Sequence, residues 1–267
     1  MLRLPAVAGQ FYPAAPAELS ALIRKYTAKH EPRQRVRACL VPHAGYVYSG
    51  HVAGAVFARI VLPKRVVILG VRHQPHGESL AILSEGAWRT PLGDAPIDTD
   101  LALRLRNACP SLREDSVAHS REHSLEVELP FLQELDPAFS FVPIAIGHLR
   151  FEELDKTGRE IGRALLDVSE DVLLVTSSDM NHYEDDETTR WKDHMAMERL
   201  LQLDAKKLYQ TCTEERISMC GLGPAVVMLS ALKTLGVQNA QVVRYATSGD
   251  VSADRSAVVG YAGMIFY

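Results

Sequence analysis

The chain has 267 residues, of which 47% are hydrophobic and 23% are charged, and its formal net charge is −4 at pH 7. Because it lacks the basic excess that is typical of nucleic-acid-binding proteins, we expect no nucleic-acid partner. No apolar stretch of the signal-peptide type follows Met1, and no run of about 18 apolar residues predicts a membrane span. We therefore expect a cytoplasmic protein without a membrane partner.

The predicted elements alternate between apolar strands and helices. In chain order they are an extended stretch at 5–13, a helix from Pro16 to about His30, a strand at 38–41, a helix at 50–61, strands at 65–70 and 79–83, a turn-rich loop at 88–94, a helix at 98–109, a strand at 140–147, a helix at 151–168, a strand at 171–178, helices at 185–201 and 225–235, and strands at 241–247 and 256–267. This alternation predicts an α/β fold with a central, mostly parallel or mixed sheet flanked by helices.

The segment 119–135 allows two interpretations. If it is helical, Glu122, His123 and Glu126 share one surface, because residues three and four apart are neighbours on a helix. The alternative is a solvated acidic face. Pro130 within this pattern implies a kink or a boundary.

The four cysteines form no C-x-x-C pair, so we expect reduced thiols rather than a disulfide framework. The sequence contains no solenoid-type repeat, no low-complexity segment and no Gly/Ser-rich linker. We therefore expect a single domain over residues 1–267.

Histidines follow several of the predicted strands, and these strand ends carry the residues His43, His73, His148 and the pair Asp179 and His182. In open α/β sheets, ligands bind outside the carboxyl ends of the strands, where loops converge. We therefore take these loops as the candidate site, although His148 is expected to be structural. The alternative for His43 is a structural histidine that is bonded to a nearby carbonyl group.

Imidazole and carboxylate groups suit divalent transition metals, and two histidines with one acid suit non-haem Fe(II). A thiolate from Cys220 would shift the preference towards softer ions such as Fe, Cu or Zn. Cys220 lies among glycines before a predicted helix, whose N-terminus favours the thiolate. The alternative is that Cys220 is a small hydrophobic core residue.

Other chemistries have less support. The sequence has no G-x-S-x-G nucleophile elbow, no P-loop and no G-x-G-x-x-G dinucleotide fingerprint. A Ser-His-Asp triad of Ser178, His43 and Asp179 stays open. The simpler interpretation is that 177–179 is a strand-end turn that orients His182.

Six motifs in the same order resemble the Memo family, which in prokaryotes is also called AmmeMemoRadiSam system protein B. They are PHAGY with YSG at 42–50, LG before His73, RTPLG at 89–93, EHSLE with LP at 122–130, SSD at 177–179 with His182, and Cys220-Gly221 before Pro224. The match runs from about Val7 to the C-terminus. The resemblance implies a fold similar to the LigB-type class III extradiol dioxygenases, which is an α/β sandwich around a central sheet.

The resemblance also implies a set of site residues. The family pocket that corresponds to the dioxygenase iron site is lined by two histidines and a cysteine. Here they match His43, His73 and Cys220 as metal ligands. The other residues that the resemblance places at this pocket are Asp179, His182, Tyr46, His123 and Glu126.

Two features depart from the dioxygenase and family patterns. A thiol replaces the carboxylate of the dioxygenase ligand set, so ring-cleaving activity is not expected to be inherited. Arg72 and Gln74 flank His73. The cation of Arg72 either repels a metal or attracts an anionic ligand.

The sequence thus favours a Memo family protein with a LigB-like pocket that binds Fe(II) or Cu, with Zn as an alternative, and a redox or oxygen-dependent activity on an unknown small substrate. A second hypothesis is a non-enzymatic module whose pocket recognises a peptide or an anionic ligand. A third, which the system name implies, is an accessory protein that works with a radical-SAM partner.

Overall fold

The computed structural model describes residues 1–28 and 32–267. Its strands are β1 (Leu2–Arg3), β2 (Ala38–Val41), β3 (Arg65–Val71), β4 (Leu80–Ile82), β5 (Ala87–Thr90), β6 (Gly93–Pro96), β7 (Arg113–Glu114), β8 (Ser140–Ile146), β9 (Val172–Ser177), β10 (His182–Glu184), β11 (Ala240–Thr247) and β12 (Val258–Phe266). Its helices are α1 (Pro16–Thr27), α2 (Tyr46–Phe57), α3 (Thr99–Ala108), α4 (Val117–Ser120), the 3-10 helix η1 (Glu126–Glu128), α5 (Leu129–Leu135), α6 (Phe151–Leu166), α7 (Asp186–Leu201), α8 (Ala205–Glu214), α9 (Leu222–Thr234) and α10 (Gly249–Ser252). Among the described residues, no helix combines the length and the apolar character that a membrane crossing requires.

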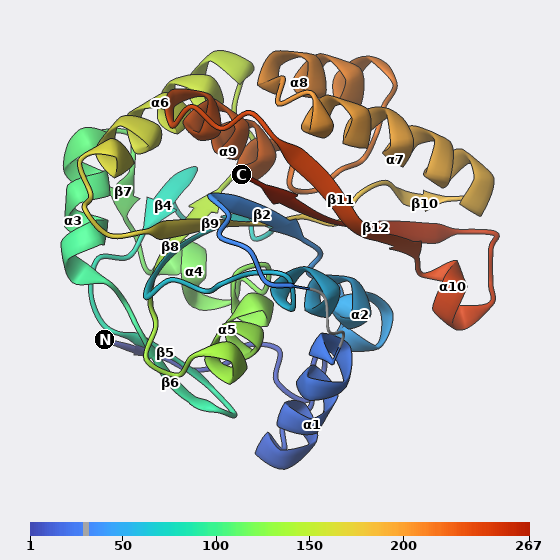
Figure 1. Cartoon of the computed structure of the whole chain (residues 1–267), viewed down its shortest axis with the longest axis horizontal. Coiled ribbons are helices and arrows are strands. Elements are labelled where there is room, and N and C mark those ends of the chain that lie inside the picture. The colour runs from blue at the N-terminus through green and yellow to red at the C-terminus, as the bar shows by residue number, and fades with distance from the viewer. Residues whose placement is uncertain (29–31) are drawn as a thin grey trace.

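A central mixed sheet organises the chain, with strand order β10-β12-β2-β9-β3-β8-β4-β7 and β11 paired to β12 (Figure 1). Its middle strands β2, β9, β3 and β8 are parallel to one another. On either side, β12 and β4 run antiparallel to their neighbours β2 and β8. The predicted α/β class with a mixed central sheet is confirmed, and the carboxyl ends of the parallel strands share one edge.

The sheet is buried on both faces, and β3 shows how. Val67 and Leu69 belong to one hydrophobic core with residues of α3, α6 and α9, whereas Val66 and Ile68 belong to a second core with residues of α1, α2 and α5. This follows from the alternation of side chains along a strand. Figure 1 shows the corresponding layers, with α6 and α9 on one side of the sheet and α2 and α5 on the other.

Most predicted elements are present within a few residues of their expected bounds, with the following differences. The expected helix end near His30 lies outside the described residues. The expected loop at 88–94 is instead part of the β5–β6 hairpin, whose turn uses the positive φ of Gly93, 122°. Helix α8 was not predicted, because only Leu208 and Cys212 of this short helix are buried.

The segment 119–135 is not one helix, so the predicted helical face with Glu122 and Glu126 four residues apart is wrong. Helix α4 ends at Ser120, a turn follows, and η1 and α5 begin at Glu126 and Leu129. The Glu122 carboxylate accepts the backbone N–H of Ser124 at 2.9 Å, and such local bonds compete with helix formation. Proline is well tolerated in a first helical turn, and Pro130 accordingly lies in the first turn of α5.

Helices α6 and α9 pack closely because small residues line their contact. A Cβ atom added at Gly158 would meet the carbonyl oxygen of Val227 and the side chain of Ser230 at 2.6 Å. A Cβ atom at Gly162 would lie 2.8 Å from the Ala231 carbonyl oxygen. This contact fixes α9, whose first turn follows directly after Cys220 and Gly221.

We expect Gly158→Ala to lower the free energy of unfolding by about 1–3 kcal/mol, because the added methyl group forces α6 away from α9. The loss occurs although alanine has the higher helix propensity. Chemical denaturation against wild type measures it. Lys156→Ala, at an exposed position of the same helix, is the matched control and should change stability by less than about 0.5 kcal/mol. A Gly158→Ala protein as stable as the control would contradict this packing argument.

Candidate metal centre

Three imidazole rings meet at the carboxyl edge of the parallel strands. His43 follows β2, His73 follows β3, and His123 lies in the turn between α4 and η1. The ring centroid of His43 lies 5.2 Å from that of His73 and 5.4 Å from that of His123. The rings of His73 and His123 stack with a centroid distance of 4.6 Å. One nitrogen of each ring lies within 4.8 Å of the others, so this cluster could hold a metal ion.

His43 is buried, and hydrogen bonds fix both its backbone and its ring. Its backbone N–H donates to Asp179 Oδ1 at 2.8 Å, and its Nδ1 lies 2.8 Å from Ser177 Oγ. Burial, and then the neighbouring imidazoles, lower the pKa of His43 well below its usual range. The ring is therefore neutral, which is the state that a metal ligand needs.

The His73 side chain is oriented by a buried acid. Both its backbone N–H and its Nδ1–H donate to the Glu122 carboxylate, at 2.6 and 2.8 Å. This leaves Nε2 of His73 as the free ring nitrogen. Burial alone would raise the pKa of Glu122, but the bonds from His73 and Ser124 prevail and lower it to about 2. A carboxylate on the far ring nitrogen is the usual partner of a metal-binding histidine.

Sequence reasoning did not assign Glu122 this role; it placed Glu122 on one helical surface with His123 and Glu126, with a solvated acidic face as the alternative. Its position directly before His123 in the EHSLE motif was the available signal. His123 packs on Phe11 at a centroid distance of 4.8 Å. Burial lowers the pKa of His123 to about 4, against the opposing charge of Glu122. His123 thus joins His43 as a neutral imidazole, and the structure places it in the cluster itself.

Cys220 lies at the wall of the same cavity. Its Sγ is 3.2 Å from His43 Nε2 and accepts the backbone N–H of Asp179 at 3.2 Å. Burial, followed by the Asp179 charge, raises the pKa of the Cys220 thiol. The predicted thiolate is therefore wrong for the protein without a cation, because burial outweighs the hydrogen bonds to the sulfur. The alternative of a plain core residue also fails, because Cys220 lines the cavity.

Asp179 and His182 also line this cavity, next to the histidines and Cys220. Asp179 Oδ1 accepts the backbone N–H groups of His43 and Ala44, at 2.8 and 3.2 Å. Burial raises the pKa of Asp179 to about 6, against the opposing charge of His182. His182 uses its Nδ1 on the Ser218 carbonyl oxygen at 3.0 Å, which leaves its Nε2 available.

The Ser-His-Asp triad that the sequence left open is not formed. Ser178 Oγ donates to the carbonyl oxygen of Asp179 and accepts the Gly221 N–H, and the His43 ring bonds Ser177 instead. The Asp179 carboxylate bonds the backbone of His43 rather than its ring. This geometry provides no activated serine nucleophile.

Tyr46 and Glu126, which were expected in the pocket, do not line the cavity. The Tyr46 side chain is 2% exposed and its hydroxyl donates to the Val127 carbonyl oxygen at 2.6 Å. Glu126 is fully buried and accepts hydrogen bonds from four donors of the N-terminal segment, namely Arg3 Nη1, Tyr12 Oη and the N–H groups of Ala6 and Val7. Tyr46 thus ties α2 to η1, and Glu126 ties the N-terminal segment to η1.

Arg72 is not among the residues that line this cavity, and its guanidinium bonds its own loop instead. Nη1 donates to the carbonyl oxygens of Gln74 and His76, at 2.9 and 3.3 Å. Arg72 and His148 line a smaller cavity of about 160 Å³, whose lining also includes Cys220. The His73 loop thus uses Arg72 to fix its own shape.

The histidine cluster opens into a cavity of about 600 Å³. Its wall consists of Phe11, His43, Ala44, Gly45, His73, His123, Asp179, His182, Tyr183, Ser218, Cys220, Val259 and Tyr261. A volume of this size admits a small molecule. Neutral imidazoles, a thiol and adjoining free space fit a transition-metal ion with open coordination positions.

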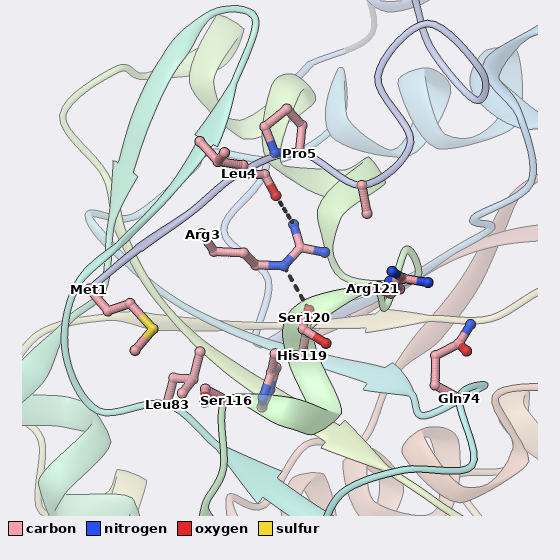
Figure 2. Close-up of a pocket in the computed structure, with 11 residues that line it drawn as sticks. Met1, Arg3, Leu4, Pro5, Gln74, Leu83, Ser116, His119, Ser120 and Arg121 are labelled. Atoms are coloured by element: carbon pink, nitrogen blue, oxygen red, sulfur yellow. Dashed lines mark hydrogen bonds between the residues drawn. The ribbon is translucent and has the colours of Figure 1, made fainter.

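Figure 2 shows a second cavity, of about 710 Å³, which neighbouring residues of the same loops line. In it Arg3 donates from Nε to the His119 carbonyl oxygen at 2.7 Å and from Nη1 to the Leu4 carbonyl oxygen at 3.4 Å. Its Nη2 donates to the Glu122 carbonyl oxygen at 2.7 Å. The guanidinium carbon also lies 4.0 Å from the centroid of the Trp88 ring. Arg3 thus fixes the turn that carries the acid and the imidazole of the cluster.

Comparison with known proteins adds the following. The model of the family described as Memo-like protein matches residues 3–265. A MEMO1 family protein of Methanopyrus kandleri is 40% identical, with 100% of this chain and 99% of that protein covered. MEMO1 family proteins of Aquifex aeolicus and Archaeoglobus fulgidus are 41% and 43% identical, with 99% of both chains covered in each case. Among solved structures, an uncharacterized protein of Escherichia coli has a TM-score of 0.59 at 13% identity, with 86% of this chain and 100% of that chain covered, which indicates a shared fold alone.

The stabilisation by Glu122 should depend on pH in a defined direction. Because the pKa of Glu122 falls from its ordinary 4.5 to about 2 in the folded protein, its contribution is fully present above pH 4.5 and is lost as the pH falls through 2. With about 1.4 kcal/mol for each pKa unit, the contribution is about 3 kcal/mol. Glu122→Gln should lose this amount at neutral pH and little at pH 2, as denaturant unfolding at several pH values would measure. Glu78→Gln, an exposed carboxylate of the His73 loop, is the control; equal pH profiles of the two variants would refute the assignment.

Proposed function

The chain belongs to the family of Memo-like proteins, and from this premise we propose that His43, His73 and Cys220 hold a redox-active divalent metal ion. We further propose that the ion is Fe(II), with Cu as the second choice and Zn as the third, and that the protein catalyses an oxygen-dependent reaction of a small substrate.

The observation that carries the proposal is the convergence of nitrogen and sulfur donors at one point. The rings of His43, His73 and His123 offer nitrogens within 4.8 Å of one another, and Cys220 Sγ lies 3.2 Å from one of them. The bond from His73 to Glu122 supports the same assignment, since it directs the free lone pair of that ring away from the acid.

The choice of a redox metal follows from the donor types and the free volume. Imidazole and sulfur suit Fe and Cu, and a closed structural zinc site would not adjoin a cavity of about 600 Å³. A bound ion of this kind would supply redox chemistry and a Lewis acid at the cavity wall. Because a thiol takes the place of the carboxylate ligand of the dioxygenases, the proposed reaction does not include ring cleavage.

The residues beside the ligands are suited to move protons. Asp179 has a pKa of about 6, which lies close to neutral pH, as a general acid or base requires. His182 presents its free Nε2 at the same cavity. The aromatic side chains of Phe11, Tyr183 and Tyr261 also line this cavity and offer ring surface to a small planar substrate.

Metal analysis of protein purified without oxygen tests the proposal. We expect near-stoichiometric iron in wild type and a loss of at least about tenfold in affinity for Fe(II) in Cys220→Ser and in His43→Ala. Cys109→Ser removes a buried thiol elsewhere, and His194→Ala removes an exposed histidine, so both controls should keep the metal. His123→Ala decides whether the third imidazole is a ligand. If it is, His123→Ala should lose as much affinity for Fe(II) as Cys220→Ser does.

The result that would overturn the proposal is wild-type protein that contains no metal and also binds none of Fe(II), Cu and Zn on titration. That outcome would favour the alternative of an accessory module, in which the pocket binds a peptide or an anionic ligand and the protein works with a radical-SAM partner. A pull-down with such a partner would be the next experiment.

A further inference from the structure

Glu128 is a buried acid with an unusual shortage of partners. It lies in η1, is fully buried, and has no basic side chain as a hydrogen-bond partner in the described part of the chain. Its Oε1 lies 2.9 Å from Ser177 Oγ, and its Oε2 has no partner among these residues. The titratable groups that sense its charge are Cys39, Tyr46 and Asp179, none of them cationic. An ionised carboxylate in such surroundings is strongly disfavoured.

The hydroxyl group of Ser177 makes three short contacts at once. Its Oγ lies 2.6 Å from the carbonyl oxygen of Ser124, 2.8 Å from His43 Nδ1 and 2.9 Å from Glu128 Oε1. A serine hydroxyl has one proton to donate and two lone pairs that accept. The identity of the single acceptor therefore determines where the protons of the other two partners lie.

One assignment turns all three contacts into hydrogen bonds. The Ser124 carbonyl carries no proton, so Ser177 must donate to it, which also fits the shortest distance. Ser177 Oγ then accepts from the two remaining partners, which requires a proton on His43 Nδ1 and a proton on Glu128 Oε1. If Ser177 donated to Glu128 or to His43 instead, two oxygen atoms would face each other at 2.6 Å without a proton between them.

We propose that Glu128 is a neutral carboxylic acid that, through Ser177, holds His43 in the tautomer with a proton on Nδ1 and a free lone pair on Nε2. Glu128 is thus a positioning residue, because it touches neither a substrate nor a ligand atom of the cluster. Burial raises the pKa of Glu128 well above its usual range, which agrees with this proton count. The proton assignment itself needs no metal, whereas its consequence for metal binding rests on the proposed function.

The two histidines are then held by two acids in opposite states. His73 donates to the ionised Glu122, and His43 donates to an oxygen whose own supporting acid is neutral. Both arrangements leave Nε2 free, and His43 Nε2 accordingly faces Cys220 Sγ at 3.2 Å. A neutral Glu128 avoids a second full negative charge in the same buried volume.

Infrared difference spectroscopy of the protein as purified tests the protonation state. The carbonyl stretch of a protonated carboxylic acid should be present in wild type at pH 8 and absent in Glu128→Gln. Nitrogen-proton NMR of the zinc-loaded or metal-free protein should show a slowly exchanging proton on His43 Nδ1. The proposal would be overturned if wild type and Glu128→Gln showed the same carboxylic-acid bands at pH 8. This outcome does not depend on whether the protein binds a metal.

Fe(II) affinity, measured by competition with a chelator, tests the positioning role. The amide of Glu128→Gln can donate to Ser177 as the acid does, so its affinity should remain close to that of wild type. Ser177→Ala removes the acceptor of His43 and should lower the affinity about 10–100-fold. A Glu128→Gln protein that loses as much affinity as Ser177→Ala would mean that an ionised Glu128 is required, which contradicts the assignment. Thermal unfolding confirms that each variant is folded.

Discussion

The architecture of the candidate site depends on the burial of three carboxyl groups in one short segment. Glu122, Glu126 and Glu128 are all fully buried. A buried carboxyl group is tolerated only with partners that satisfy it, so each one fixes a different part of the molecule. Glu122 holds the His73 loop, Glu126 holds the N-terminal segment, and Glu128 meets Ser177 at the end of β9.

The surroundings of these acids, and not their residue type, set their charge. The donors that converge on Glu122 lower its pKa, whereas Glu128 has a single hydroxyl partner and a raised pKa. Functional sites often contain residues of the same type whose different surroundings give them different pKa values. Here this difference would give each histidine a fixed tautomer while it limits the negative charge beneath the cluster.

The sequence predicts the frame of this site better than its details. The apolar strands before His43 and His73 predict a shared sheet edge, because parallel strands bring their carboxyl ends together. The place of His123 depends on a turn, which the helical pattern at 119–135 conceals. The turn forms because the hydrogen bonds that Glu122 accepts from the backbone of His73 and Ser124 outweigh the helical periodicity. The burial of Tyr46 likewise depends on a distant carbonyl group, that of Val127, which no local pattern indicates.

The thiol of Cys220 links these electrostatics to metal selection. Burial and the charge of Asp179 both favour the neutral thiol, so the folded protein without a cation carries an uncharged sulfur beside neutral imidazoles. A thiol proton is lost readily only when a cation compensates the negative sulfur. Ions that bind weakly to sulfur and imidazole, such as Mg²⁺ or Ca²⁺, cannot provide that compensation. If the site holds the metal proposed above, the same burial that makes the free thiolate unfavourable would favour a transition metal over these hard cations.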